Sequence, residues 1–269
     1  MNIKTAPLWQ WILLVIASLF LAFFGYGLIF GVGEAFHNSW IATAAASLGI
    51  LALYVLVVRW FEKGWAPDIL SNKWAPHLLL GLVIGALFFV LVVGVMRLFG
   101  ICSLEKLSFD GKAQWEAFMM FFGVAVGEEV LFRGVLYKWI DKRWGMWVAL
   151  VVSGLVFGLV HVTNDKATLW SGFAIAIEAG LLLGAAYKWS GTLWLPIGIH
   201  WAWNYTQGNI FGFAVSGNDA GSMWFKVTTQ GPDLLTGGPF GAEASIICVV
   251  LGAAIAAVFV WDCVRRGKA

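Results

Sequence analysis

Ionisable and amide side chains interrupt three strongly apolar segments of this chain. The segments read FMMFFGVAVGEEVLFRGVLY, VALVVSGLVFGLVH and LWLPIGIHWAWN. Their polar members are Glu128, Glu129, Arg133, His161, His200 and Asn204. All three segments are hydrophobic enough to lie in a bilayer, where an ionisable group is costly to insert and usually faces the interior of a helix bundle. We therefore predict that these side chains form a polar site within the membrane.

The composition also favours a membrane protein. Hydrophobic residues make up 61% of the 269 residues and charged residues only 12%, whereas a soluble domain has about 25% charged residues. The 17 Trp and 21 Phe suit lipid-facing surfaces with aromatic belts. A net charge of +2 gives no indication of nucleic acid, and none is expected as a partner. The cysteines Cys102, Cys248 and Cys263 form no CxxC pair, and they predict neither a disulfide framework nor a thiolate metal site.

Eight segments are long and apolar enough to be membrane helices, because crossing the hydrocarbon core takes roughly 20 apolar residues. They cover residues 9–33, 39–60, 76–99, 115–140, 146–162, 168–189, 192–210 and 242–264. The first is expected to be a retained helix, because its apolar run exceeds the roughly 7–15 residues of a signal peptide. Each span is expected to be helical, since backbone groups find no water in lipid. The predicted fold is an all-α bundle of about eight transmembrane helices, in one membrane domain over residues 1–269.

The distribution of Lys and Arg predicts the orientation. With the N-terminus inside and Arg133 set aside, the basic residues of the inner side are Lys4, Arg59, Lys63, Lys73, Lys138, Lys142, Arg143, Lys188, Arg265, Arg266 and Lys268. Those of the outer side are Arg97, Lys106, Lys112, Lys166 and Lys226. This excess favours two cytoplasmic termini. The glycine-rich connection 211–241 is then external, and a plain solvated loop is favoured over one that covers the mouth of the bundle.

Helical spacing predicts one ion pair in the first polar segment. Glu129 and Arg133 are four residues apart, share a helix face and are expected to pair, because an unpaired charge is very costly in a low dielectric. Glu128 lies about 100° further round the helix and is expected to face a second partner. The alternative for Glu129 and Arg133 is a purely structural contact between helices.

The other two segments repeat the four-residue spacing. His161 follows Phe157 by four residues, and Asn204 follows His200 by four. Taken singly, such residues can be a hydrogen-bonded core histidine or a polar clamp between helices. Counted at about 1.5 Å per residue from the inner helix ends, however, Glu128, His161 and His200 fall in one central slab. Their common depth predicts that they meet.

A carboxylate and two imidazoles at one place suit the activation of water. Such a group can hold a water and deprotonate it as a general base, and the same side chains can instead bind Zn²⁺, which lowers the pKa of its water to about 7. An Asn amide and a His N–H can donate to an oxyanion during attack on an amide carbonyl. No Ser or Cys nucleophile accompanies these residues at a recognisable spacing, and H-E-x-x-H is absent.

The three motifs together resemble those of one protease family. E-E-x-x-x-R at residues 128–133, F-x-x-x-H at 157–161 and H-x-x-x-N at 200–204 are similar to the motifs of the CPBP (CAAX protease and bacteriocin-processing, or Abi) intramembrane proteases. This family includes the type II CAAX prenyl endopeptidases and is commonly described as metalloproteases. The resemblance covers about residues 115–209, the expected catalytic core. It implies a bundle around a conical cavity and hydrolysis of peptide bonds by activated water.

The resemblance also implies roles for the motif residues. Glu128 and His161 would activate the water, and His200 and Asn204 would stabilise the oxyanion. Glu129, in the catalytic group, and Arg133 would shape the site, to which Phe157 also contributes. If a zinc ion is required, its ligands would be Glu128, His161 and His200. The sequence leaves the need for metal open, and it leaves Glu178, another carboxylate in an apolar helix, without a motif.

The expected partner is a peptide or protein substrate, either membrane-bound or lipidated, together with the surrounding membrane lipids. A prenylated CAAX tail is one option, which the expected location in a bacterial or archaeal plasma membrane disfavours. The alternative is a non-catalytic family member that serves bacteriocin self-immunity or acts as a membrane scaffold. A transporter with a proton-relay carboxylate is a third class, against which the absence of inverted repeats argues.

Overall fold

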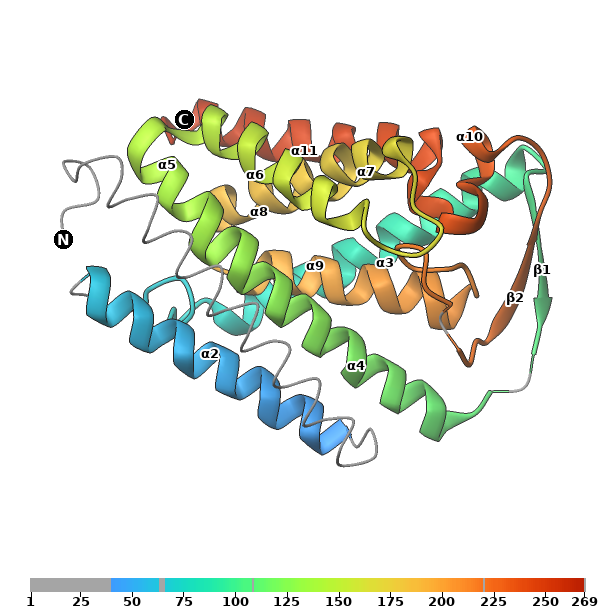
Figure 1. The fold of residues 1–269 in the computed structure, drawn as a ribbon, viewed down its shortest axis with the longest axis horizontal. Helices are drawn as coiled ribbons and strands as arrows, with labels where there is room; N and C mark the ends of the chain where they lie inside the picture. Colours follow the sequence, from blue (N-terminus) through green and yellow to red (C-terminus); the bar gives the residue numbers. More distant parts are fainter. Residues whose placement is uncertain (1–39, 63–65, 108, 220, 269) are drawn as a thin grey trace.

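The computed structural model of this protein describes residues 40–62, 66–107, 109–219 and 221–268. The predicted first span, residues 9–33, lies outside the described residues, as do Lys4 and Lys63. The α-helices are α2 (Trp40–Glu62), α3 (Trp74–Leu98), α4 (Gly111–Glu129), α5 (Lys138–Trp144), α6 (Met146–His161), α7 (Leu169–Ile175), α8 (Leu182–Ser190), α9 (Trp194–Tyr205), α10 (Asp233–Thr236) and α11 (Ile246–Arg265). Figure 1 shows most of them running along one long axis as a bundle.

Three of the helices widen into π-helical segments. These are η1 (Val130–Tyr137) between α4 and α5, η2 (Ala176–Leu181) between α7 and α8, and η3 (Thr206–Ile210) after α9. The predicted segments 115–140, 168–189 and 192–210 are therefore helical apart from one or two residues at the start of the last two, although not regularly α-helical. A π-helical turn inside a helix is frequent at functional sites. Glu128 and Glu129 directly precede η1, Arg133 lies within it, Asn204 lies just before η3, and Glu178 lies within η2.

The outer surface of the bundle suits lipid. Within the described residues, the helices long and apolar enough to cross a membrane are Trp40–Trp60, Trp74–Leu98, Leu169–Ser190 and Ile246–Arg265, and the helix Met146–His161 is apolar but shorter. Large apolar side chains of α2, α3, α6 and α11 are more than half exposed, among them Leu56, Leu87, Leu159 and Val258. The prediction of an all-α membrane bundle is thus confirmed, and the chain is an integral membrane protein. The number of eight spans stays a prediction.

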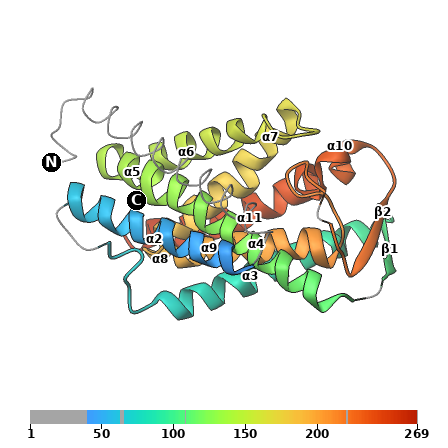
Figure 2. The same cartoon turned by 60° about the horizontal axis from the view of Figure 1, so that its bottom comes forward.

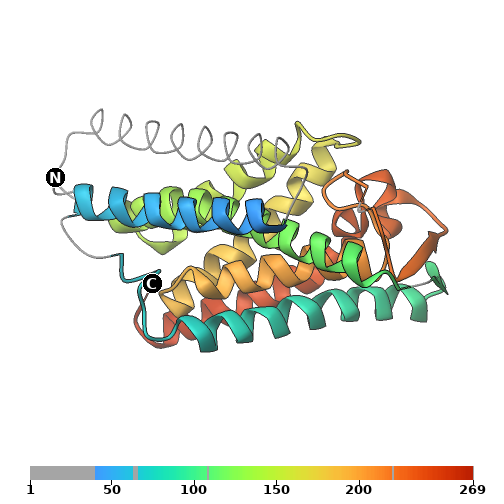
Figure 3. The same ribbon diagram turned by 90° about the horizontal axis from the view of Figure 1, so that it is seen from below.

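Glycines bring the site-bearing helices into backbone contact. A methyl group on Gly81 of α3 would collide with the carbonyl oxygen of Leu195 on α9. A methyl group on Gly158 of α6 would likewise collide with the carbonyl oxygen of Gly172 on α7. Small residues allow such close approach between membrane helices, where dispersion contacts replace the hydrophobic effect as the packing force. The close contacts fix the positions of α6 and α9 (Figures 2 and 3).

The connection 211–241 is structured, so the prediction of a plain solvated loop is wrong. It contains α10 and the strand β2 (Phe225–Thr229), which pairs antiparallel with β1 (Cys102–Lys106). Cys102 lies opposite Thr229 at one end of the register and Lys106 lies opposite Phe225 at the other. Figure 1 places this two-stranded sheet and α10 at one end of the bundle, and α5 with the last turn of α11 at the opposite end.

Candidate active site

Two imidazoles face a single oxygen of Glu128. The Nε2 atoms of His161 and His200 each lie 3.9 Å from Oε2 of Glu128. This oxygen is buried and has no hydrogen-bond partner among the described residues, although 24% of the Glu128 side chain is exposed. A separation of 3.9 Å is too long for a direct hydrogen bond but suits a bridging water. Side chains from α4, α6 and α9 therefore converge, as their common depth predicted.

The second nitrogen of each imidazole fixes the ring. Nδ1 of His161 lies 2.7 Å from the carbonyl oxygen of Phe157, and Nδ1 of His200 lies 2.9 Å from Oε1 of Glu129. A carbonyl oxygen or an ionised carboxylate can only accept, so we assign the proton to Nδ1 in both rings. In the neutral rings, each Nε2 then keeps its lone pair. The gap beside Glu128 is thus bordered by three acceptor atoms, which is an arrangement for a water molecule or a cation.

The predicted pair of Glu129 and Arg133 is confirmed. Nη1 of Arg133 donates to Oε1 of Glu129 at 2.7 Å, and both side chains are buried. Nη2 of Arg133 donates to the carbonyl oxygens of Ala179 and Gly180, on the neighbouring helix, at 3.2 and 3.3 Å. Because the same Glu129 oxygen also accepts from His200, the ion pair sets the orientation of that imidazole.

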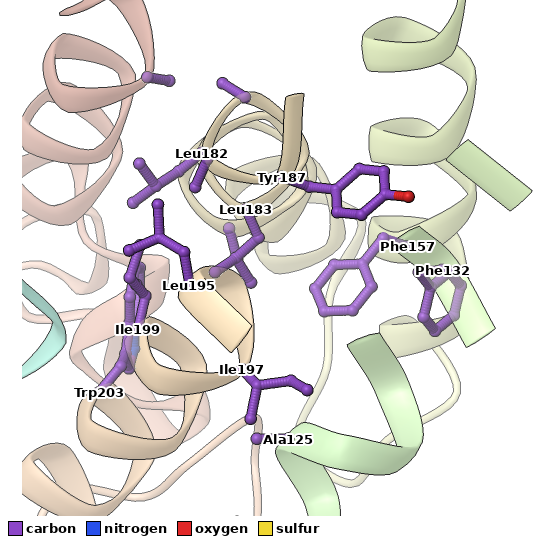
Figure 4. Packing of buried hydrophobic residues seen from close by; sticks show 14 of the residues in the cluster. Ala125, Phe132, Phe157, Leu182, Leu183, Tyr187, Leu195, Ile197, Ile199 and Trp203 are labelled. Atoms are coloured by element: carbon purple, nitrogen blue, oxygen red, sulfur yellow. The ribbon is translucent and has the colours of Figure 1, made fainter. Parts of the chain in front are cut away.

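The ring of Phe157 supports both parts of this arrangement. Its centroid lies 4.4 Å from the guanidinium carbon of Arg133 and 4.6 Å from the centroid of His161. Phe132 packs edge-on against it, with centroids 4.8 Å apart, and Figure 4 shows these two rings next to each other. A cation over an aromatic face is attracted by the ring quadrupole. The phenylalanine of F-x-x-x-H therefore covers the ion pair and holds the imidazole from one side.

A small cavity lies beside the motif residues. Its volume is about 20 Å³, which is room for one water molecule. His161, His200 and Asn204 line it together with apolar side chains of α7 to α9. The Asn204 side chain is buried, yet within the described residues no other group forms a hydrogen bond with its amide. Its donor and acceptor atoms are thus available to a bound molecule.

Two glutamates outside the three motifs line the same cavity. Glu178 lies on η2 and Glu243 lies on the 3₁₀ turn η5 (Ala242–Ala244), and both are buried. The backbone N–H of Ser216 donates to Oε1 of Glu243. Burial raises the pKa of Glu243 to about 7, against the lowering effect of hydrogen bonds from Ser216 and Gln207. The sequence singled out Glu178 because it is a carboxylate in an apolar helix. Glu243 lies at the edge of the predicted segment 242–264, and no sequence signal pointed to it.

The donor types at Glu128 fit a zinc ion. Two imidazoles, one carboxylate and a water form a common catalytic zinc shell, in which the second nitrogen of each His is held by a hydrogen bond. Ligands of a tetrahedral zinc lie about 3.3 Å apart, so the 3.9 Å separations would have to shorten. Within the part of the chain that the structure describes, no three His, Cys, Asp or Glu side chains lie close enough together to hold a metal. The ligand types of these residues therefore suit zinc, whereas their 3.9 Å separations suit a bridging water.

Comparison with known proteins finds similarity in the segment that carries the candidate site. Residues 111–206 match the family model described as Type II CAAX prenyl endopeptidase Rce1-like. The uncharacterized protein YpbD of Bacillus subtilis (strain 168) is 35% identical over 77 residues, which are 29% of this chain and 35% of YpbD. The chain thus matches about a third of the length of this curated relative. Residues 111–206, which hold all three motifs, are thus similar to the type II CAAX prenyl endopeptidases.

Proposed function

We propose that this protein is an intramembrane endopeptidase that hydrolyses a peptide bond with a water held by Glu128 and His161. The observation that supports it most is the unpartnered Glu128 oxygen, which two imidazole Nε2 atoms face at 3.9 Å. A buried carboxylate oxygen without a partner is costly unless a bound molecule satisfies it. The match of residues 111–206 to the type II CAAX prenyl endopeptidase model supports an endopeptidase of this general type.

The side chains suggest how the water reacts. A water in the gap donates one hydrogen to Oε2 of Glu128 and the other to Nε2 of His161, which leaves an oxygen lone pair free to attack a carbonyl carbon. Glu128 takes the proton as the carbon–oxygen bond forms. The buried Glu129–Arg133 pair and the Phe157 ring keep both imidazoles oriented during this step.

The oxyanion would form on the side of Asn204 and His200. The buried Asn204 amide, which has no hydrogen-bond partner among the described residues, can donate an N–H. His200 can donate from Nε2 only as an imidazolium, because its Nδ1 already carries the proton bonded to Glu129. The carboxylate of Glu129 stabilises the imidazolium form of His200 by its negative charge.

We expect Asn204→Ala to slow cleavage by about 10²–10³-fold, the usual cost of removing one oxyanion donor. The purified protein in lipid vesicles would be given an internally quenched peptide that ends in a CAAX sequence, in farnesylated and unmodified forms, and fluorescence would report cleavage. Asn72→Ala, at an exposed position just before α3, is the matched control and should cleave at the parental rate. Parental activity in Asn204→Ala would exclude the amide from the oxyanion site, and a parent inactive on both peptides would favour the non-catalytic alternative.

A zinc ion would change the chemistry of the water but not the set of residues. Glu128, His161 and His200 would hold it, and when bound it would lower the pKa of the water to about 7. Elemental analysis of the purified protein distinguishes the zinc-dependent mechanism from the metal-free one. About one equivalent of zinc, lost on chelation together with activity, supports the metal form, whereas full activity without metal supports the carboxylate and imidazole alone.

We also propose that both termini are cytoplasmic. The basic side chains of α5 and of the last turn of α11 lie at the end of the bundle opposite to the sheet (Figure 1). In Asp219→Cys, at the end that holds the sheet, we expect labelling of intact cells by a membrane-impermeant maleimide, because the Asp219 side chain is 87% exposed. Lys268→Cys should react only after permeabilisation. Labelling of Lys268→Cys from outside would reverse the assignment.

A further inference from the structure

The cavity has an acidic wall that the proposed water-activating step does not use. Glu178 and Glu243 line it, with exposed fractions of 0% and 2%. Gly252 lets α11 pass directly over the backbone of Glu178, where any larger side chain would collide. This close approach seals the Glu178 side chain from lipid and leaves the cavity as its open side.

In the part of the chain that the structure describes, neither glutamate has a cation beside it to balance a buried negative charge. Oε2 of Glu178 accepts only from the thiol of Cys248, at 3.2 Å, and its Oε1 has no hydrogen-bond partner among the described residues. Glu243 is better satisfied, because it accepts from the backbone and side chain of Ser216 and from Gln207. In the described ranges, neither carboxylate forms an ion pair with Lys or Arg, since the neighbouring Arg133 is held by Glu129. The other titratable groups that border the cavity are His161 and His200.

Electrostatics limits the charge that this pair can carry. An ionised carboxylate without a cation is very costly in a buried place, and two such groups near each other cannot both be ionised at moderate cost. The pKa of Glu243, raised to about 7 by its burial, agrees with partial protonation of this carboxyl group at neutral pH. A protonated carboxyl group also needs a hydrogen-bond acceptor. The unpartnered oxygen of Glu178 lines the same cavity as Glu243, so a water in that cavity can link the two carboxyl groups.

We propose that Glu178 and Glu243 hold one proton between them and deliver it to the nitrogen that leaves the scissile bond. This inference rests on the proposed endopeptidase function. The water oxygen bonds to the carbonyl carbon and its proton goes to Glu128. The carbon–nitrogen bond then breaks, and its electron pair on nitrogen takes the proton of the glutamate pair, which is left ionised. After the products leave, the pair regains a proton from solvent and Glu128 releases its proton to solvent. An amine must be protonated to leave an amide, and Glu128 is not among the residues that line the cavity.

The resting proton can be tested without a substrate. Infrared spectra of the purified protein at neutral pH should contain the carbonyl band of a protonated carboxylic acid, which shifts in D₂O. The band should disappear in the double variant Glu178→Gln/Glu243→Gln and persist in Glu116→Gln, the same substitution at a partly exposed position of α4. A spectrum without this band in the parent, or one in which the double variant retains it, overturns the shared proton.

The delivery of the proton is tested by changing the leaving group. Glu178→Gln and Glu243→Gln should slow cleavage of the quenched CAAX peptide by about 10²–10⁴-fold. They should cleave the matched ester peptide, whose activated alcohol leaves without a proton, at nearly the parental rate, whereas Glu128→Gln should lose both substrates. Equal losses on amide and ester contradict the role as leaving-group acid. If the parent cleaves neither substrate, the proposed function and the delivery step fail together, and the infrared band still decides the shared proton.

Discussion

Glu128→Gln is expected to lower the rate of peptide cleavage by about 10⁴-fold, the upper end of what a general base contributes. The amide keeps the shape of the carboxylate but cannot take a proton from water. The substitution should leave the fold intact, because Oε2 of Glu128 has no hydrogen-bond partner among the described residues that could be lost. Cleavage of the quenched CAAX peptide and the melting temperature would be measured on the same purified sample.

The control for this experiment is Glu116→Gln, which removes a carboxylate from the exposed start of the same helix. It should match the parent in both rate and melting temperature. His161→Ala should also lose activity, because it removes the second atom that holds the water. A Glu128→Gln protein that cleaves at the parental rate would remove Glu128 as the base.

Arg133→Ala is expected to destabilise the protein by about 3–5 kcal/mol, the usual cost of leaving one member of a buried ion pair. The substitution removes the donor to Glu129, both donors to the carbonyl oxygens of the neighbouring helix, and the contact with Phe157. Thermal unfolding in detergent and the amount of protein in the membrane would report the loss. Arg97→Ala, an exposed position at the end of α3, is the control and should unfold like the parent.

A double variant separates the charge from the packing. Glu129→Gln/Arg133→Met removes both charges and keeps most of the volume, so it should recover part of the stability lost in Arg133→Ala. It should still cleave poorly, because His200 loses the carboxylate that orients its ring. If Arg133→Ala melts and accumulates like the parent, then the pair does not stabilise the fold.

The geometry of the motif residues could be predicted because a membrane leaves few choices. Spans must be helices, so the four-residue spacing of Glu129 and Arg133 was enough to predict their pairing, which the structure confirms at 2.7 Å. Polar groups must face the interior, so equal depth was enough to predict that Glu128 meets His161 and His200. The same reasoning predicted that Glu128 would turn away from Arg133.

The second wall of the site could not be predicted, because its contacts depend on tertiary packing. Glu243 lies beside the cavity only because the connection 211–241 folds back and Ser216 bonds to it. The π-helical segment that carries Glu178 has no local sequence signal. The same holds for a buried network at the other end of the bundle, where Asp68 accepts from Tyr187 and pairs with Lys138. Its members are far apart in the sequence and no motif connects them.

The central claim is that this site hydrolyses a peptide bond with its own activated water, and isotope labelling tests it most directly. The purified protein and its Glu128→Gln variant would be incubated with the CAAX peptide in H₂¹⁸O, and the products weighed by mass spectrometry. We expect the parent to cut one peptide bond and to place a single ¹⁸O in the new carboxyl group, with no product from the variant. Equal product from both proteins, or an uncut peptide with the parent, would contradict the claim.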